Sequence, residues 1–162
     1  MGAGEAGQIE VRGPQVFREY WDRPAETRAA FTADGWFRTG DDGVVEDGYW
    51  RILGRRSVDI IKSGGYKVSA LEIEAALRQH PAVADAAVIG LPDEEWGERV
   101  CAAVVPEAGQ EIDGEALRAW CKERLAPYKV PKQVAMMTHL PRNAMGKVTK
   151  PALRPLFTEP AQ

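Results

Sequence analysis

Residues 57–81 constrain the fold of this chain most, because they place a hairpin turn directly before the start of a helix. Residues 57–62 form a strand-like run, Ser63-Gly64-Gly65 predicts a turn, and residues 66–68 predict the returning strand. Two successive glycines suit a tight turn because glycine adopts positive φ angles without steric cost. A hairpin followed at once by a helix favours a mixed α and β layer.

The helix that follows begins with a capping box. Ser69 stands at the cap, and Glu72 follows three residues later. The Ser69 hydroxyl can accept a hydrogen bond from the Glu72 backbone N–H, and the Glu72 carboxylate can accept one from the Ser69 backbone N–H. The helix is expected to run to about Gln79, because Pro81 lacks a backbone N–H and prevents continuation. Its buried stripe consists of Ala70, Ile73 and Leu77.

The rest of the chain predicts further strands and two more helices. Strand-like runs cover residues 82–91, 99–105 and 133–138. Asp113 can cap a second helix. The apolar stripe of that helix consists of Leu117, Trp120, Cys121 and Leu125. Thr149 can cap a final helix with Pro151 in its first turn. This order predicts an α+β fold, with helices on one face of a short, three-stranded mixed sheet and the hairpin of residues 57–68 beside it.

The first 54 residues do not read as a complete domain. They predict a strand at 8–12, a helix start at Pro24 with a brief helix at 25–31, and a hairpin over 43–53 that turns at Asp47-Gly48. Large aromatic side chains are frequent here, and these few elements cannot cover them. We therefore expect residues 1–54 to be the β-rich C-terminal end of a larger domain, and residues 55–162 to be a separate small domain.

Composition argues for a globular protein, since 44% of the 162 residues are hydrophobic and 28% are charged. No apolar run reaches the roughly 20 residues of a membrane span, and the first ten residues lack a basic and apolar leader, so a cytoplasmic location is expected. Cys101 and Cys121 do not form a CxxC pair, and only His80 and His139 could join them. We expect no metal site and two buried, reduced thiols.

The charge is unevenly distributed along the chain. Residues 1–54 carry 6 basic and 10 acidic side chains, whereas residues 126–162 carry 6 basic side chains and one acidic side chain. A basic tail on an acidic protein suits an anionic partner, and phosphate-bearing ligands fit better than nucleic acid because few aromatics accompany the lysines. A solvated basic face fits the charge equally well.

Three segments stand out by their order and spacing: WFRTGD at residues 36–41, residues 54–74 with IIKSGGYK at their centre, and PRNAMGK at residues 141–147. Together they resemble motifs of the adenylate-forming superfamily, which includes acyl-CoA synthetases, non-ribosomal peptide adenylation domains and luciferases. The similarity runs from about Gly7 to Phe157. Within the superfamily, the sequence around Trp96 and Tyr128 most resembles malonyl- and methylmalonyl-CoA synthetases.

The resemblance implies an ATP-dependent acid–CoA ligase. In such enzymes a carboxylate attacks the α-phosphorus of ATP to give acyl-AMP and pyrophosphate, and the CoA thiol then attacks the acyl-AMP after the C-terminal domain has rotated. The resemblance makes Lys147 the catalytic lysine of the first step, where negative charge grows on the phosphate. ATP or AMP, CoA and Mg²⁺ are the implied cofactors, with Mg²⁺ held mainly by a large N-terminal domain.

The same resemblance assigns five binding residues. Asp41 and Arg55 would hold the nucleotide, Gly64 and Gly65 would line the CoA tunnel, and Lys67 would face a phosphate of CoA or AMP. Simpler interpretations remain for each of them. Asp41 lies in a turn-rich run, the glycines also suit a plain hairpin, and Lys67 fits a surface position equally well.

The neighbouring positions carry further expectations. Arg56 rivals Arg55 as the nucleotide contact, and the hinge of the mobile domain falls on Ser57 or Val58. Lys150 is expected on the surface of the last helix's first turn. Trp96 and Trp120 are expected to be packing residues. A P-loop at Gly146-Lys147 is excluded, because Pro141 and Val148 replace the glycine and the Ser/Thr that this motif requires.

The large AMP-binding domain of the superfamily has no counterpart here, since 54 residues cannot hold it and no Ser/Thr/Gly-rich phosphate loop precedes the three motifs. We therefore expect the chain to supply residues to a missing N-terminal domain, to act on a small carboxylic acid with ATP and CoA, and to be inactive alone. Nucleic acid and membrane partners are not expected. The alternative is a non-catalytic fragment that binds a nucleotide, CoA or a protein.

Overall fold

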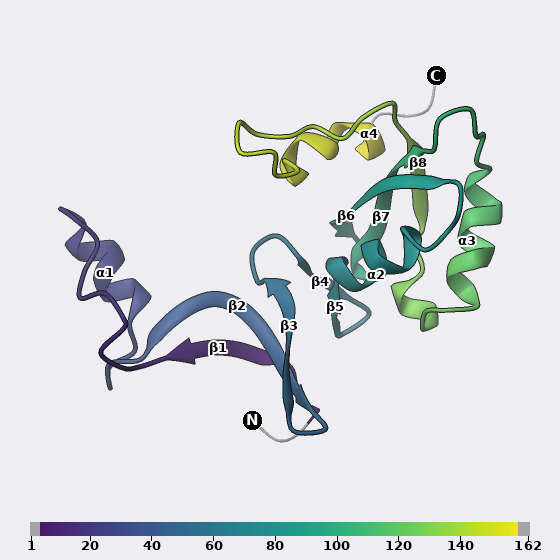
Figure 1. Cartoon of the computed structure of the whole chain (residues 1–162). Coiled ribbons are helices and arrows are strands. Elements are labelled where there is room, and N and C mark those ends of the chain that lie inside the picture. Colours follow the sequence, from purple (N-terminus) through teal and green to yellow (C-terminus); the bar gives the residue numbers. More distant parts are fainter. Residues whose placement is uncertain (1–3, 159–162) are drawn as a thin grey trace. The chain divides into compact units, whose positions relative to one another are not determined.

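The computed structural model describes residues 4–158 and divides into two compact units, residues 1–57 and 58–162 (Figure 1). The division falls between Ser57 and Val58, the two positions that the sequence offers for a hinge. Each unit is described by itself below.

The first unit is a small antiparallel sheet with one short helix. Its elements are β1 (Gly7–Val11), α1 (Pro24–Ala30), β2 (Phe37–Glu46) and β3 (Tyr49–Arg55), and the strand order is β1-β2-β3. The β2–β3 turn is at Asp47-Gly48, as predicted, and both residues have positive φ angles. Pro24 begins α1, also as predicted.

This unit has little core of its own. Among its described residues, Val44 and Leu53 are the buried hydrophobic side chains. Trp21 is 93% exposed, and Trp50 and Ile52, which lie on one face of β3, are each 65% exposed. Exposed apolar side chains in such number indicate a surface that another body of protein covers. The expectation that residues 1–54 are the end of a larger domain fits this exposure.

The second unit contains a five-stranded sheet. Its strands are β4 (Ile60–Ser63), β5 (Tyr66–Ser69), β6 (Val83–Asp93), β7 (Gly97–Pro106) and β8 (Gln133–Met136). The order is β5-β4-β7-β6, and β8 pairs with β7 in parallel while the other pairs are antiparallel. The predicted α+β class with a mixed sheet is confirmed, but the sheet has five strands and not three. The β4–β5 hairpin joins the sheet through the bridge of Ser63 to Gly97, and local periodicity cannot reveal such a long-range pairing.

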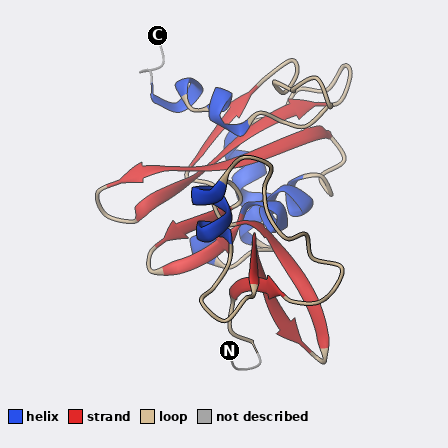
Figure 2. Ribbon diagram, turned by 90° about the vertical axis from the view of Figure 1, so that its left-hand side faces the viewer, coloured by secondary structure: helices blue, strands red, loops and turns tan. Residues whose placement is uncertain are grey.

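The helical elements lie on both faces of this sheet, and the prediction of one covered face was also wrong. They are α2 (Ala70–Leu77), α3 (Gly114–Lys122), the 3₁₀ turns η1 (Pro127–Lys129) and η2 (Lys150–Leu153), and α4 (Pro155–Thr158). Figure 2 shows the helices in blue and the strands in red. Side chains of β6 and β7 alternate between two cores, as a strand period of two requires. Val88 and Val100 pack with α2 and α3, whereas Ile89 and Cys101 pack with η2 and α4.

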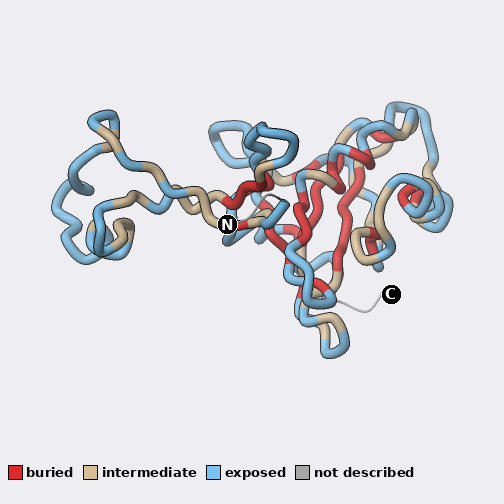
Figure 3. The backbone as a smooth tube through the Cα atoms, turned by 90° about the horizontal axis from the view of Figure 1, so that it is seen from below, coloured by how far each residue is buried: buried red, intermediate tan, exposed pale blue. Residues whose placement is uncertain are grey.

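The local signals for the helices mostly hold. The Ser69 side chain accepts a hydrogen bond from the Glu72 backbone N–H, and Asp113 caps α3 through the N–H of Ala116. Thr149 makes no side-chain cap bond, and the expected final helix is a 3₁₀ turn followed by four α-helical residues. Figure 3 shows the buried backbone concentrated in the strands of the second unit.

Candidate functional site

Lys147 lies on an exposed hairpin that is built largely by one side chain. The Asn143 carboxamide oxygen accepts hydrogen bonds from the backbone N–H groups of Met145 and Lys147, each at 3.0 Å. The Asn143 N–H in turn donates to the Lys147 carbonyl at 2.8 Å. Gly146 supplies a positive φ of 76°, which a residue with a side chain rarely adopts. The hairpin therefore fixes the backbone at Lys147.

The side chain of Lys147 is exposed, and within residues 4–158 no partner for its Nζ is found. Other cations of the basic tail are engaged. Lys129 pairs with Glu72 at 2.6 Å, and Arg142 pairs with Asp85 at 2.5 Å. The basic tail is therefore more than a solvated face, because it holds several ion pairs inside the unit and presents Lys147 to the outside.

The structure overturns the expectation for Lys150. This lysine is buried, with 8% exposure, and its Nζ lies 2.6 Å from Asp59 Oδ1 and 2.8 Å from Glu74 Oε1. Sequence reasoning missed all three residues. The signal is too weak to find from sequence, because the partners lie 91 and 76 positions away and acidic residues are common along the chain.

Asp41 and Arg55 are brought together in the first unit. They are register partners on β2 and β3, and Arg55 Nε lies 3.2 Å from Asp41 Oδ1. Arg55 also donates to the Thr39 carbonyl at 2.7 Å, and a Cβ at Gly40 would lie 2.8 Å from its Nη1. A glycine at that position leaves room for the arginine to pass.

Arg56, the rival of Arg55, is directed to a different carboxylate. Its Nε donates to Asp42 Oδ1 at 2.8 Å, and the Asp42 side chain is 1% exposed. Arg55 therefore stands beside the predicted ribose ligand, while Arg56 neutralises a buried neighbour. Within the described residues, Asp42 Oδ2 is buried without a hydrogen-bond partner.

Gly64 and Gly65 form the two-residue turn between β4 and β5, with φ angles of 58° and 83°. The Gly64 N–H donates to the Trp96 carbonyl at 2.9 Å, and a Cβ at Gly64 would lie 3.1 Å from the Trp96 ring. A Cβ at Gly65 would meet open space. Gly64 is thus held against the protein, and Gly65 faces outward.

Aromatic residues that the sequence did not assign to the site support this turn. Tyr66 stacks on Tyr128 with ring centroids 4.3 Å apart, and Lys132 Nζ lies 4.2 Å from the centre of the Trp96 ring. Trp96 is therefore a neighbour of the turn and belongs to neither core. Trp120, by contrast, packs against the core of α2 and α3, as expected.

Lys67 follows on β5, where it is exposed and is the register partner of Lys62. Two adjacent cations on the exposed side of a hairpin give this edge a positive charge.

The turn and the Lys147 hairpin lie at opposite ends of the β6–β7 ribbon. The turn contacts Trp96, which follows the end of β6, whereas the hairpin is tied to Asp85 near its start. Asp93 lies eight positions after Asp85, which corresponds to roughly 26 Å along an extended strand. The two ends cannot serve one reacting atom at the same time.

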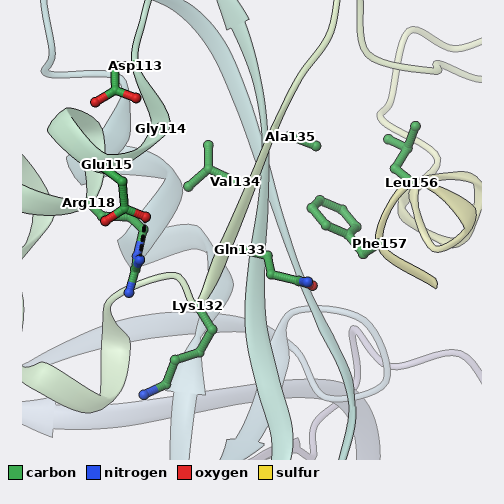
Figure 4. Close-up of a pocket in the computed structure, with 10 residues that line it drawn as sticks. All are labelled: Asp113, Gly114, Glu115, Arg118, Lys132, Gln133, Val134, Ala135, Leu156 and Phe157. Carbon is green, nitrogen blue, oxygen red and sulfur yellow. Dashed lines mark hydrogen bonds and ion pairs between the residues drawn. The ribbon is translucent and has the colours of Figure 1, made fainter. Parts of the chain in front are cut away.

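The cavity drawn in Figure 4 has a volume of about 550 Å³ and lies between α3, β8 and α4. Its lining includes Arg118, Lys132 and Phe157 and none of the predicted site residues. Among the described residues, no group of three His, Cys, Asp or Glu side chains could hold a metal ion. In the same part of the chain, no helix is long and apolar enough to cross a membrane.

Both cysteines are free and buried, as predicted. Burial raises the pKa of the Cys101 thiol, and the nearby Arg99 opposes this rise in part. Burial also raises the pKa of Cys121, against an opposing effect of Arg124. Neither thiol is suited to act as a nucleophile at neutral pH, because the thiolate is the reactive form.

Residues 72–147 match the family of the AMP-binding enzyme C-terminal domain. The mitochondrial malonate–CoA ligase ACSF3 of Bos taurus is 57% identical over 89% of this chain and 25% of its own length, and the malonate–CoA ligase of Arabidopsis thaliana is 48% identical over 94% and 27%. The chain thus spans about a quarter of the length of these relatives.

Solved structures agree with the sequence relatives. ATP-bound MatB from Rhodopseudomonas palustris matches with a TM-score of 0.86 and 42% identity, over 98% of this chain and 32% of that one. The o-succinylbenzoate CoA synthetase MenE from Bacillus subtilis, in complex with an acyl-adenylate intermediate, matches with a TM-score of 0.86 and 37% identity, over 100% of this chain and 32% of that one. The chain therefore carries, in residues 72–147, the C-terminal domain of the AMP-binding enzymes.

Proposed function

We propose that this chain is the C-terminal part of an acid–CoA ligase and supplies the catalytic lysine of adenylation, Lys147. The observation that carries the proposal is the presentation of one exposed cation on a hairpin with a fixed backbone. Two unit charges about 4 Å apart interact by roughly 4 kcal/mol at an effective dielectric constant of 20, so a held ammonium can stabilise charge growing on the α-phosphate.

Asp41 and Arg55 take the nucleotide in this proposal. A carboxylate can accept hydrogen bonds from both ribose hydroxyls, and Arg55 Nε lies 3.2 Å from the carboxylate of Asp41. The Gly64-Gly65 turn takes the pantetheine arm of CoA, because backbone without side chains permits close passage. Lys67 adds positive charge for a phosphate of CoA or AMP.

The separation of these features supports two successive half-reactions. Lys147 and the glycine turn lie at opposite ends of one ribbon, so the second unit must present first one end and then the other to the same substrate. The proposed substrates of the whole enzyme are a small carboxylic acid such as malonate, ATP and CoA, in line with the relatives' names. Mg²⁺ and an N-terminal AMP-binding domain are added to the proposal from the resemblance of the sequence motifs. The cytoplasmic location expected from the sequence stays a prediction, and the bovine relative is named as mitochondrial.

The test uses a ligase in which this chain replaces the corresponding part of the Arabidopsis thaliana malonate–CoA ligase. Lys147→Ala is expected to lower the rate of acid-dependent pyrophosphate release by about 10²–10³-fold, as removal of other preorganised charge-stabilising groups does. Thioester formation from added acyl-adenylate is expected to stay within a few-fold. The matched control is Lys122→Ala, an exposed lysine in the last turn of α3. Unimpaired pyrophosphate release by Lys147→Ala would contradict the proposal.

A non-catalytic binding fragment is the second candidate, favoured by the exposed Trp21 and Trp50 side chains of the first unit, which suit a protein partner. Isothermal titration of the chain with AMP, CoA and a purified N-terminal AMP-binding domain separates the candidates. Tight binding to the protein, with no pyrophosphate release from the reconstituted pair, would favour the binding fragment.

A further inference from the structure

The buried cluster of Lys150, Asp59 and Glu74 is a feature that the proposed chemistry does not use. Lys150 begins η2, Glu74 lies on α2, and Asp59 directly precedes β4 at the start of the second unit. The side chain of Lys150 is 9% exposed, that of Glu74 is 7% exposed and that of Asp59 is 14% exposed. One ammonium group therefore holds two carboxylates from parts of the chain that are distant in sequence.

Glu74 also completes the edge of the sheet. Its Oε1 accepts a hydrogen bond from the Val88 N–H at 2.9 Å, and β6 is the outer strand of the order β5-β4-β7-β6. Lys150 binds the same carboxylate oxygen at 2.8 Å. The cluster thus connects three parts of the second unit: the edge strand β6, the first residues of the unit, and the segment that follows Lys147.

We propose that Lys150 is a positioning residue for Lys147, and that its ion pairs with Asp59 and Glu74 hold the catalytic hairpin in place on the second unit. This inference rests on the proposed role of Lys147 in adenylation. The hairpin closes directly before the turn η2, where the Thr149 N–H donates to the Pro141 carbonyl at 2.8 Å. Lys150 comes next in the chain, so any movement of its backbone is passed directly to the hairpin.

The hairpin has two ionic anchors, and they differ in strength. Arg142 on the first arm pairs with Asp85, but its side chain is 47% exposed and the pair is screened by solvent. Lys150 after the second arm is buried, and breaking a buried pair leaves uncompensated charge inside the protein. Lys150 is therefore the stronger anchor of the hairpin. Arg142, which also donates to the Gly146 carbonyl at 2.6 Å, is a second and weaker anchor.

The kinetic test uses the same chimaeric malonate–CoA ligase. Lys150→Met is expected to lower kcat for acid-dependent pyrophosphate release by about 10-fold to 100-fold, because a misplacement of about 1 Å costs on the order of 10² in rate. The KM for ATP and the thioester step from added acyl-adenylate are expected to stay within about threefold. Lys150→Arg, which keeps the charge, is expected to recover most of the rate, and Arg142→Met to lose less than Lys150→Met.

A second measurement does not depend on activity. Hydrogen exchange of the 162-residue chain is expected to be faster at the amides of Lys147 and Thr149 in Lys150→Met, with the amides of β7 unchanged. If Lys150→Met does not fold, Asp59→Asn takes its place, because it keeps the pair of Lys150 with Glu74 and is expected to give the same pattern in weaker form.

Two results would overturn the inference. The first is a folded Lys150→Met variant whose hydrogen exchange in the hairpin and whose rate of pyrophosphate release both equal those of the unsubstituted protein. The other is an equal loss of both half-reactions, which marks a general structural role. Failure of the proposed function is a different result, in which Lys147→Ala retains full adenylation. The hydrogen-exchange data would then still report whether Lys150 holds the hairpin.

Discussion

Two lysines three residues apart, Lys147 and Lys150, meet opposite surroundings. Lys147 extends from a hairpin into solvent, whereas Lys150 is buried between two carboxylates. The same charge therefore serves two purposes within one segment. An exposed ammonium on a fixed backbone can meet an anion from outside, and a buried one can only hold what already surrounds it.

This contrast predicts selective acetylation. Treatment of the chain with acetic anhydride at neutral pH is expected to modify Lys147 much faster than Lys150, because Lys150 is 8% exposed and held by two ion pairs. In the chimaeric ligase, acetylation of Lys147 is expected to slow adenylation more than the thioester step, since it removes the charge that the first step uses. Peptide mass spectrometry and the two half-reaction assays check this. Equal loss of both steps upon acetylation of Lys147 would contradict it.

The two cysteines predict a change of stability in alkaline solution. Burial raises the pKa of both thiols above the ordinary 9.0, so the folded protein holds these protons more tightly than the unfolded chain. Their contribution is fully present below pH 9 and is lost as the pH rises through the folded pKa values. Measured by urea unfolding between pH 8 and 11, the free energy of unfolding is expected to decline more steeply for the unsubstituted protein than for the double variant Cys101→Ala and Cys121→Ala. Parallel curves would refute the effect.

At the scale of elements, the helix starts differ in how they are built. The Asp113 side chain accepts a hydrogen bond from the N–H of Ala116 at 3.0 Å, whereas the Thr149 side chain makes no cap bond at the start of η2. Asp113→Ala is expected to lower the free energy of unfolding by about 1 kcal/mol. Thr149→Ala is expected to change it by less than about 0.5 kcal/mol. Chemical denaturation of both variants gives the comparison, and equal losses would show that the cap bond is not the cause.

Local signals predicted the elements well, and their pairing poorly. The Gly64-Gly65 turn, the Ser69 cap and the start of α1 at Pro24 each depend on neighbours in sequence, so the residues themselves reveal them. The five-stranded sheet depends on the bridge of Ser63 to Gly97, and the Lys150 cluster depends on residues many positions away. Such contacts are set by the packing of the whole unit, which no local period encodes.

The candidate site shows the same division. The position of Lys147 on a glycine-containing turn and the nearness of Asp41 to Arg55 could be anticipated from the motifs. The stacking of Tyr66 on Tyr128 and the place of Trp96 beside Gly64 could not, because both join segments that are far apart along the chain. The catalytic and binding roles of these residues stay predictions.

At the scale of the whole molecule, both hydrophobic cores lie within residues 58–162, and the first unit leaves large aromatic side chains exposed. The chain spans about a quarter of the length of its malonate–CoA ligase relatives.

We therefore predict that the chain alone releases no pyrophosphate in the presence of malonate and ATP, and that adding an N-terminal AMP-binding domain restores the reaction. A pyrophosphate assay of the chain, the domain and their mixture checks this. Acid-dependent turnover by the 162 residues alone would refute it, with Lys147→Ala as the control for contaminating activity.

The β6–β7 ribbon has a consequence for how such a chain can change over evolutionary time. Its ten paired positions keep the lysine hairpin and the glycine turn far apart while holding both in one folded body. A substitution near Asp85 therefore leaves the surroundings of Trp96 intact, and the reverse also holds. In the proposed ligase, we expect the activation of the acid and the acceptance of the thiol to be adjustable one at a time, so that an enzyme containing a descendant of this chain could acquire a new acyl acceptor and still form an adenylate.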